Sequence, residues 1–251
     1  MYYFLGALLP EISLGEEPEM RFSELVQLLR EIAPKKHFAA TQRMRRLIDL
    51  DNVRQELKDE LHNPNGSLTQ KEIEEALLNQ TDLPEYVFEI LGRTEDKKKQ
   101  IDEFSEVFMT FFRTEAEREV GFLKRYFAFE RAFRLCLLAF RAQKMQRNLQ
   151  HELRYADHHD FLVRELPEFP FEMKDLADLL ASLPENDPWA EYCAIARYRF
   201  DKIEDLGGID PFCLTAVMSY MLRLMIAEEW FTMSQEKGEQ KLNAMIGSAN
   251  E

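Results

Sequence analysis

The segment from Asp205 to Phe231, DLGGIDPFCLTAVMSYMLRLMIAEEWF, decides the fold of this chain. Two glycines precede an Asp210-Pro211 pair, and the residues that follow carry almost no charge until Glu228. Asp210 can accept hydrogen bonds from the free amides of a first helical turn, and Pro211 suits the first helical position. Because the polar face of the predicted helix is narrow, we expect a central helix rather than a surface one.

Arg223 is the single charged residue in the interior of that predicted helix. An unpaired buried guanidinium would be very costly, so the side chain must either reach the surface or pair with a carboxylate. An internal ion pair is the structural interpretation, and a contact with a partner molecule is the functional one. The sequence leaves both open.

The rest of the chain is also predicted to be helical. Glycine occurs only 9 times in 251 residues, and no Asn-Gly turn lies between alternating apolar runs, so signals for strands and hairpins are scarce. We therefore predict an all-α fold, a multi-helix body with long central helices. Three segments are expected within one or two domains: an amino-terminal helical lobe (1–95), a long central helix or helical hairpin (96–165) and a carboxy-terminal helical lobe (166–251).

Capping and breaking residues set the expected helix bounds. Thr69 and Glu72 have the spacing of a capping box, and Gly121 is the one glycine in the proline-free stretch from 96 to about 155, where a long helix would break. The other helices are expected at Arg21–Ile32, Lys36–His62, Thr69–Leu78, Pro84–Leu91 and Glu172–Leu183, and from Asp187-Pro188 onward.

The formal net charge of −14 argues against nucleic acid as a partner, because phosphate binding needs clustered lysine and arginine. The segment from Lys124 to Arg154 is nevertheless basic. Its side chains spiral around a helix instead of forming one stripe, and are expected to pair with acids of this chain or with an acidic partner helix. The candidate interaction residues here are Arg131, Arg134, Arg141, Lys144 and Arg147, and Arg223 is the candidate outside the segment.

No residue pattern indicates catalysis or a cofactor. His151, His158 and His159 lie close together in the sequence, but His151 is two helical turns from the others and no His-x-x-x-His pair is present. No glycine-rich phosphate loop follows a strand, and no serine or cysteine lies in a nucleophile elbow. We predict no enzyme activity, no metal and no cofactor, with a metal-dependent enzyme centred on the three histidines as a distant alternative.

The amino-terminal segment MYYFLGALLP lacks the basic region and cleavage site of a signal peptide, and no stretch has the length of a membrane span. The sequence thus predicts a soluble cytoplasmic protein, with any membrane association made through its partners.

Three short patches resemble a central-stalk component of the V/A-type ATPases, known as the C or d subunit and written here as the C/d subunit. Asp210-Pro211 followed by Tyr220, nine residues past the proline in an apolar helix, resembles the carboxy-terminal helix of that component. The stretch LIDLDNV, which contains Asp51 and Asn52, resembles its recurring Asp-x-x-Asn-Leu element, and residues 127–134 (FAFERAFR) are similar to a later copy. Asp51, Asn52, Asp210, Pro211 and Tyr220 are therefore carried over as structural signatures.

A resemblance that covers nearly the whole chain is to an uncharacterised bacterial family encoded in V-type ATPase operons that lack an ordinary C/d subunit. It rests on the opening Tyr2-Tyr3-Phe4-Leu5 and on residues 140–144 (FRAQK). The chain departs from the C/d subunit in that Tyr220 is followed by Met221-Leu222-Arg223 in place of a Lys-Glu-x-Glu pattern, and it is shorter than the three-repeat body of that family.

These resemblances imply a non-catalytic protein of the central stalk of a V/A-type ATPase, with a fold like that of the C/d subunit. Such a protein links the shaft to the proteolipid ring and couples ATP synthesis or hydrolysis to ion transport. Its implied partners are the shaft subunits and the proteolipid ring, and its implied location is cytoplasmic, peripheral at the inner face of the membrane through these partners. The alternative is a helical adaptor or assembly factor for the same complex that has no place in the finished motor.

Overall fold

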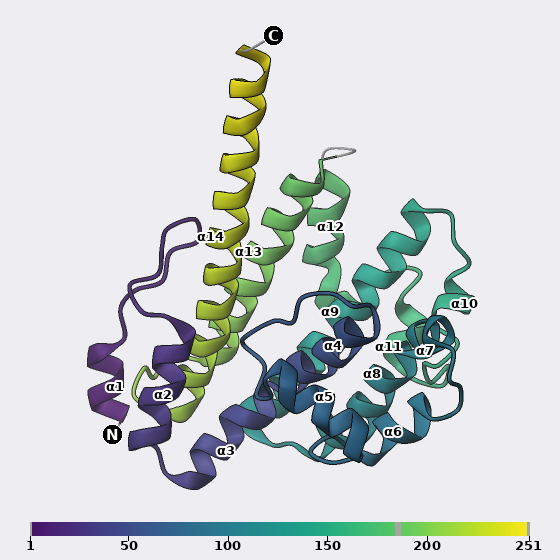
Figure 1. Ribbon diagram of the computed structural model, residues 1–251, viewed down its shortest axis with the longest axis horizontal. Coiled ribbons are helices and arrows are strands. Elements are labelled where there is room, and N and C mark those ends of the chain that lie inside the picture. The colour runs from purple at the N-terminus through teal and green to yellow at the C-terminus, as the bar shows by residue number, and fades with distance from the viewer. Residues whose placement is uncertain (1, 184–186, 250–251) are drawn as a thin grey trace. The chain divides into compact units, whose positions relative to one another are not determined.

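The computed structural model describes residues 2–183 and 187–249, and within them the chain is all-helical, with no strand (Figure 1). This confirms the predicted all-α class. The helices are α1 (Tyr2–Leu8), α2 (Phe22–Ile32), α3 (Lys35–Met44), α4 (Arg46–Leu57), α5 (Gln70–Asn79), α6 (Glu85–Leu91), α7 (Lys97–Glu103), α8 (Ser105–Phe111), α9 (Gly121–Lys144), α10 (Leu149–Glu152), α11 (Phe161–Glu165), α12 (Lys174–Ser182), α13 (Pro188–Gly207) and α14 (Leu214–Ala249). A π-helical turn, Phe112–Ala116, and a 3-10 turn, Phe171–Met173, complete the set.

The chain forms two compact units. Unit 1 joins residues 1–38 to residues 183–251, and unit 2 contains residues 39–182. This division differs from the three consecutive segments expected from the sequence. The physical reason is that α1 and α2 pack against α14, so the two ends of the chain share one core.

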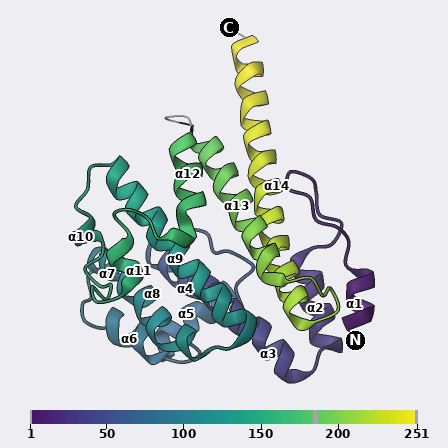
Figure 2. The ribbon, with the colours of Figure 1, turned by 180° about the vertical axis from the view of Figure 1, so that it is seen from behind.

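Unit 1 is built on the antiparallel pair α13 and α14, which lie side by side in both views (Figures 1 and 2). Leu25 of α2, Ile203 of α13 and Met221 of α14 are completely buried. From Val217 to Ala227 every side chain of α14 except Arg223 is buried, which confirms the predicted central helix.

Glu228 fixes α2 against this pair. Its Oε1 accepts a hydrogen bond from the Phe22 N–H at 2.7 Å, so a carboxylate from α14 satisfies the first amide of α2.

The two Asp-Pro pairs in unit 1 behave differently. Asp187 caps α13 by accepting from Trp189 N–H at 3.1 Å and Ala190 N–H at 3.0 Å, with Pro188 as the first helical residue. Asp210 accepts from Phe212 N–H at 2.9 Å, and this closes a turn before the helix. The prediction that Pro211 is the first helical residue is therefore wrong, because α14 begins only at Leu214.

Unit 2 packs α4, α8 and α9 around a phenylalanine-rich core. Leu50 and Val53 of α4 and Val107 of α8 are completely buried, and the rings of Phe111 and Phe127 meet edge to face with centroids 5.1 Å apart. The predicted Thr69 capping box is confirmed, since Thr69 and Glu72 bond reciprocally at the start of α5.

Two predicted helices are broken in unit 2. The expected Lys36–His62 helix is interrupted at Arg45, whose Nε donates to the carbonyl of Asn65 at 2.7 Å, and it ends at Leu57 before Asp59 at φ 56°. The stretch from 96 to 155 is divided into α7, α8, the π-helical turn and α9. The break expected near Gly121 is confirmed, because Gly121 has φ 61° at the first residue of α9.

Candidate functional site

Unit 1 exposes large apolar side chains on α1 and in the turn before α14. Tyr3, Phe4 and Leu8 come from α1 and Phe212 from the turn before α14; Tyr3 is 75% and Phe4 58% exposed. The rings of Tyr3 and Phe212 stack with centroids 4.7 Å apart, so α1 and this turn adjoin. We call these four residues the aromatic face. Grouped apolar side chains that a folded chain leaves in water are typical of docking surfaces.

A glycine allows α1 and the turn to approach so closely. A Cβ atom on Gly6 would lie 2.7 Å from Cδ1 of Phe212 and 3.1 Å from the carbonyl oxygen of Pro211. Gly6 is therefore the residue that lets the Phe212 ring lie against α1 and stack on Tyr3. Ile209, three residues before Phe212, is fully exposed beside Asp210 and Pro211.

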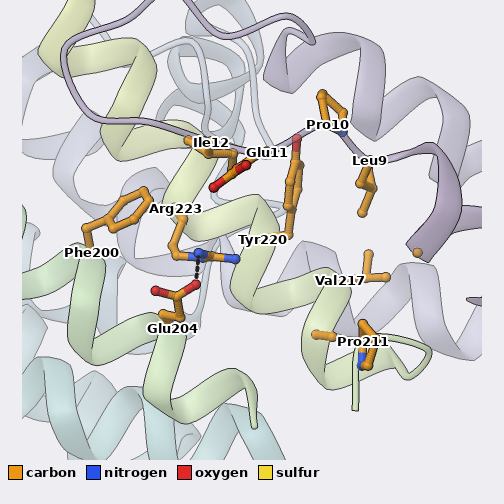
Figure 3. A pocket seen from close by; sticks show the side chains of 12 residues that line it. Leu9, Pro10, Glu11, Ile12, Phe200, Glu204, Pro211, Val217, Tyr220 and Arg223 are labelled. Atoms are coloured by element: carbon orange, nitrogen blue, oxygen red, sulfur yellow. Dashed lines mark hydrogen bonds and ion pairs between the residues drawn. The ribbon is translucent and has the colours of Figure 1, made fainter. Parts of the chain in front are cut away.

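A pocket of about 320 Å³ adjoins the aromatic face within unit 1. Its walls come from the segment after α1, from α13 and from α14 (Figure 3). Gly6 of α1 and Pro211 also line the pocket, and both lie against the Phe212 ring or its turn at the base of the aromatic face. Leu9 and Val217 form apolar walls, whereas Glu11, Tyr220 and Arg223 supply polar groups. The pocket thus combines apolar and polar walls, and its polar groups can fix the orientation of a bound group.

Arg223 lies in this pocket and forms an ion pair within the chain, as the structural interpretation predicted, although its partner carboxylate is exposed. Its Nη1 binds Oε1 of Glu204 on α13, and its guanidinium lies 5.2 Å from the centroid of the Phe200 ring. The Nε atom is buried and has no hydrogen-bond partner among the residues described. One part of the guanidinium is therefore paired, while another keeps an unused donor; contact of Arg223 with a partner molecule remains a prediction.

Tyr220 places a second unused polar group in the pocket. The residue is 7% exposed, and its buried hydroxyl has no hydrogen-bond partner within the described parts of the chain. In Figure 3 the hydroxyl points toward the segment of Pro10 and Glu11. Burial raises the pKa of Tyr220 to about 12, Arg223 opposes the rise, and Glu19 adds to it. The signature tyrosine thus has an unpartnered hydroxyl inside a folded core.

We expect Tyr220→Phe to reduce the loss of stability at alkaline pH. The folded-state pKa lies above the unfolded value of 10, so the stability that Tyr220 contributes is complete below pH 10 and is lost as pH rises toward 12. Between these limits the variant should lose less free energy of unfolding than the parent, by on the order of 1 kcal/mol. Urea unfolding at pH 9 and pH 11.5 measures this, with the exposed Tyr3→Phe as control; equal losses in Tyr220→Phe and the parent would contradict the assignment.

Two arginines of the basic segment in unit 2 form ion pairs with acidic residues of the same unit. Arg131 pairs with Asp160. Arg134 pairs with Asp51 at 3.1 Å and with buried Glu130 at 3.4 Å. These two candidate interaction residues therefore hold α9 to its neighbours, as the interpretation of pairing with acids of the same chain predicts.

The other three candidate interaction residues of the segment, Arg141, Lys144 and Arg147, are exposed. Lys144 lies 5.8 Å from the centroid of the Phe140 ring, and Arg147 is 3.9 Å from Glu152. Arg141 is exposed near the end of α9. Their role as interaction residues stays a prediction.

Asp51 and Asn52 have structural contacts in unit 2. Asp51 joins Arg54, at 3.0 Å, to Arg134 of α9. The Asn52 side chain bonds both backbone groups of Asn63, accepting from its N–H at 2.8 Å and donating to its carbonyl at 2.9 Å. The motif thus connects α4 to α9 and to the loop before α5.

The histidine-rich stretch does not form a recognisable metal site. Among the residues described, no group of three or more His, Cys, Asp or Glu side chains is arranged to hold a metal ion. Within the same residues, no helix is both long and apolar enough to cross a bilayer.

Comparison with known proteins places the chain in a family. A model described as "Protein of unknown function (DUF2764)" matches residues 1–251. The chain belongs to the DUF2764 family. Similar proteins from Chlamydia muridarum (strain MoPn / Nigg) and Chlamydia trachomatis serovar D (strain ATCC VR-885 / DSM 19411 / UW-3/Cx) are 26% and 25% identical, with 97% of this chain and 97% and 96% of theirs aligned. No solved structure matches the chain significantly.

Both chlamydial proteins are described as uncharacterized, and neither they nor the DUF2764 description names an ATPase. The resemblance to an uncharacterised bacterial family is therefore supported at the level of DUF2764 membership. The resemblance to the C/d subunit, together with the function that it implies, remains a prediction.

Several residues of this site carried no sequence signal for function. Gly6, Glu11 and Glu204 are common residue types in ordinary local contexts, and only the packing of three separate segments brings them to one place. The apolar opening MYYFLGALLP is visible in the sequence, but without the fold its exposed Tyr3 and Phe4 cannot be told from its buried Leu5.

Proposed function

We propose that this DUF2764 protein is a non-catalytic coupling subunit of a V/A-type ATPase that links the central shaft to the proteolipid ring. The observation that carries the proposal is the aromatic face, which adjoins the turn of Asp210 and Pro211 before α14; these two residues and Tyr220 of α14 resemble the C/d subunit. A protein that joins two assemblies must offer surfaces that exclude water, and tyrosine and phenylalanine are enriched in such surfaces.

The form of unit 1 suits such a link. The 36-residue helix α14 continues past the end of α13, as Figure 1 shows, and at 1.5 Å per residue it spans roughly 54 Å. Its first half is held by α2 and α13. A long helix held firmly at one end and joined to an apolar docking surface can connect two bodies without chemistry of its own.

Affinity purification from gently solubilised native membranes tests the proposal. A tagged copy at native expression level should recover the catalytic, shaft and proteolipid subunits at near one copy of this chain per motor, by quantitative mass spectrometry. Replacing Tyr3 and Phe4 together by serine should lower that recovery about tenfold or more, because buried aromatic anchors dominate interface energies. Leu61→Ser combined with Leu78→Ser is the matched control, since both leucines are highly exposed in unit 2.

Each outcome has a defined meaning. Recovery of the motor with one copy of this chain, lost in the Tyr3/Phe4 variant and kept in the Leu61/Leu78 variant, supports the coupling role. Substoichiometric recovery confined to assembly intermediates would replace it with the adaptor or assembly factor. If none of the ATPase subunits is recovered with the parent protein, the proposal is wrong.

A further inference from the structure

The pocket beside Tyr220 and Arg223 contains two buried polar groups with unmet hydrogen-bonding capacity. Arg223 Nε can only donate, and the Tyr220 hydroxyl can donate or accept; neither has a partner among the residues described. A buried polar group without a partner costs about 1–3 kcal/mol, so a site with two of them gains from a ligand that brings an acceptor. A carbonyl oxygen is such an acceptor.

The charges around the pocket select against an anion. Glu11 and Glu204 line it, and Glu19 lies close enough to Tyr220 to raise its pKa. Against these three carboxylates stands the single guanidinium of Arg223, which already pairs with Glu204. Phosphate or carboxylate ligands would meet net repulsion here, whereas a cationic group would be attracted.

Size and position identify the kind of ligand. A volume of about 320 Å³ holds one long side chain and its adjoining main chain, and lies at the low end of the roughly 300–1,000 Å³ seen for ligand sites. Leu9 and Val217 offer apolar walls along which the methylenes of a long basic side chain can lie. Because Gly6 and Pro211 belong to both the pocket and the base of the aromatic face, a protein docked on that face would reach the pocket directly.

We propose that this pocket receives a single lysine or arginine side chain from an extended segment of a partner protein. The cationic head is placed near Glu11, and the adjoining main-chain carbonyl accepts from Arg223 Nε and the Tyr220 hydroxyl. This inference deepens the proposed function and rests on it for the identity of the partner. The recognition chemistry itself rests only on the contents of the pocket.

Methyl-labelled full-length protein and three small probes test the proposal by NMR. N-acetyl-arginine amide carries the carbonyl and the cation, N-acetyl-citrulline amide has the same shape without the charge, and N-acetyl-glutamate amide is anionic. We expect the arginine probe to shift the methyl signals of Val217 and Leu9 saturably, and to bind about fivefold or more tightly than the citrulline probe. The glutamate probe should leave those signals unchanged.

Variants separate the two kinds of contact. Glu11→Gln should weaken the arginine probe about threefold or more and leave the citrulline probe unchanged, because only the former carries the charge. Glu16→Gln is the matched control, since Glu16 is exposed in the same segment and does not line the pocket. Tyr220→Phe should weaken both probes equally through the shared carbonyl, with its fold checked by thermal unfolding.

Three results would overturn the inference. The first is no saturable shift at Val217 up to the solubility limit of the probes, which is the result expected of a pocket that holds only water. The others are equal binding of the arginine and citrulline probes, and equal effects of Glu11→Gln and Glu16→Gln. The titration contains no ATPase component. The titration can therefore fail while the motor is still recovered from membranes, and it can succeed while the motor is not recovered. The two experiments thus distinguish failure of the pocket proposal from failure of the proposed function.

Discussion

Asp49→Ala is expected to lower the free energy of unfolding of unit 2 by about 3–5 kcal/mol. Asp49 is completely buried, and its carboxylate accepts from the N–H of Ser67 at 2.6 Å, from the N–H of Leu68 at 3.1 Å and from the Ser67 hydroxyl. Alanine would leave these three donors without a partner and open a small cavity. Chemical denaturation followed by far-ultraviolet circular dichroism measures the loss.

A conservative variant separates hydrogen bonding from charge. Burial raises the pKa of Asp49 in spite of its hydrogen bonds and of Arg46 at 3.9 Å, so the ionised form gains nothing net from the folded site. Asp49→Asn keeps an oxygen for the two N–H groups and should cost only about 1 kcal/mol. Exposed Asp102→Ala is the control for helix effects. A loss in Asp49→Asn as large as in Asp49→Ala would show that the charge, not the donors, matters.

This network explains what the sequence element around residue 50 does. Asp49 holds the start of the turn before α5, and Asn52 holds Asn63 in the same loop. Gly66 completes the arrangement, since a Cβ there would lie 2.7 Å from Asn52 Nδ2. The element was visible in the sequence through its resemblance to the C/d subunit, but its partners lie 11 to 19 residues away in a loop without periodicity, so only the fold identifies them.

Elements governed by local chemistry were predictable. The capping box at Thr69, the Asp187-Pro188 start of α13 and the burial of α14 each depend on residues within a few turns of the chain. The break at Arg45 was not predictable in this way. No glycine or proline stands there, and the helix is interrupted where the Arg45 side chain reaches the carbonyls of Asn65 and Gly66.

The same contrast holds for the candidate site. An ion pair for Arg223 followed from the cost of burying a lone charge, but its partner Glu204 lies on another helix and is one of 46 acidic residues in the chain. The pocket depends on the path of residues 9–12 past α14, for which the sequence contains no periodic signal. The type of interaction could therefore be inferred from one residue, whereas the location required the tertiary structure.

Close packing of α13 on α14 depends on Gly207, and Gly207→Ala is expected to destabilise unit 1 by about 2 kcal/mol. A Cβ on Gly207 would lie 2.7 Å from Oγ and 2.8 Å from Cβ of Ser219, a buried residue whose hydroxyl donates to the carbonyl of Ile203 at 2.7 Å. Alanine is the better helix former by roughly 1 kcal/mol, but this gain is smaller than the cost of separating two packed helices. Thermal and urea unfolding both report the difference.

The same substitution elsewhere in this helix pair is the control. A Cβ on Gly238 of α14 meets nothing within 4 Å, so Gly238→Ala should be neutral or stabilise the protein by up to about 1 kcal/mol. Adding Ser219→Gly to Gly207→Ala removes both clashing atoms, and the double variant should recover part of the loss, giving a non-additive cycle. Two results would contradict this explanation: Gly207→Ala as harmless as Gly238→Ala, or a Ser219→Gly change that only adds its own cost. Either would show that a Cβ at position 207 does not clash with Ser219. Phe200, Val217 and Tyr220 line the pocket and belong to the same pair of helices. Gly207→Ala should therefore also weaken the binding of the arginine probe, and the double variant should regain part of that binding.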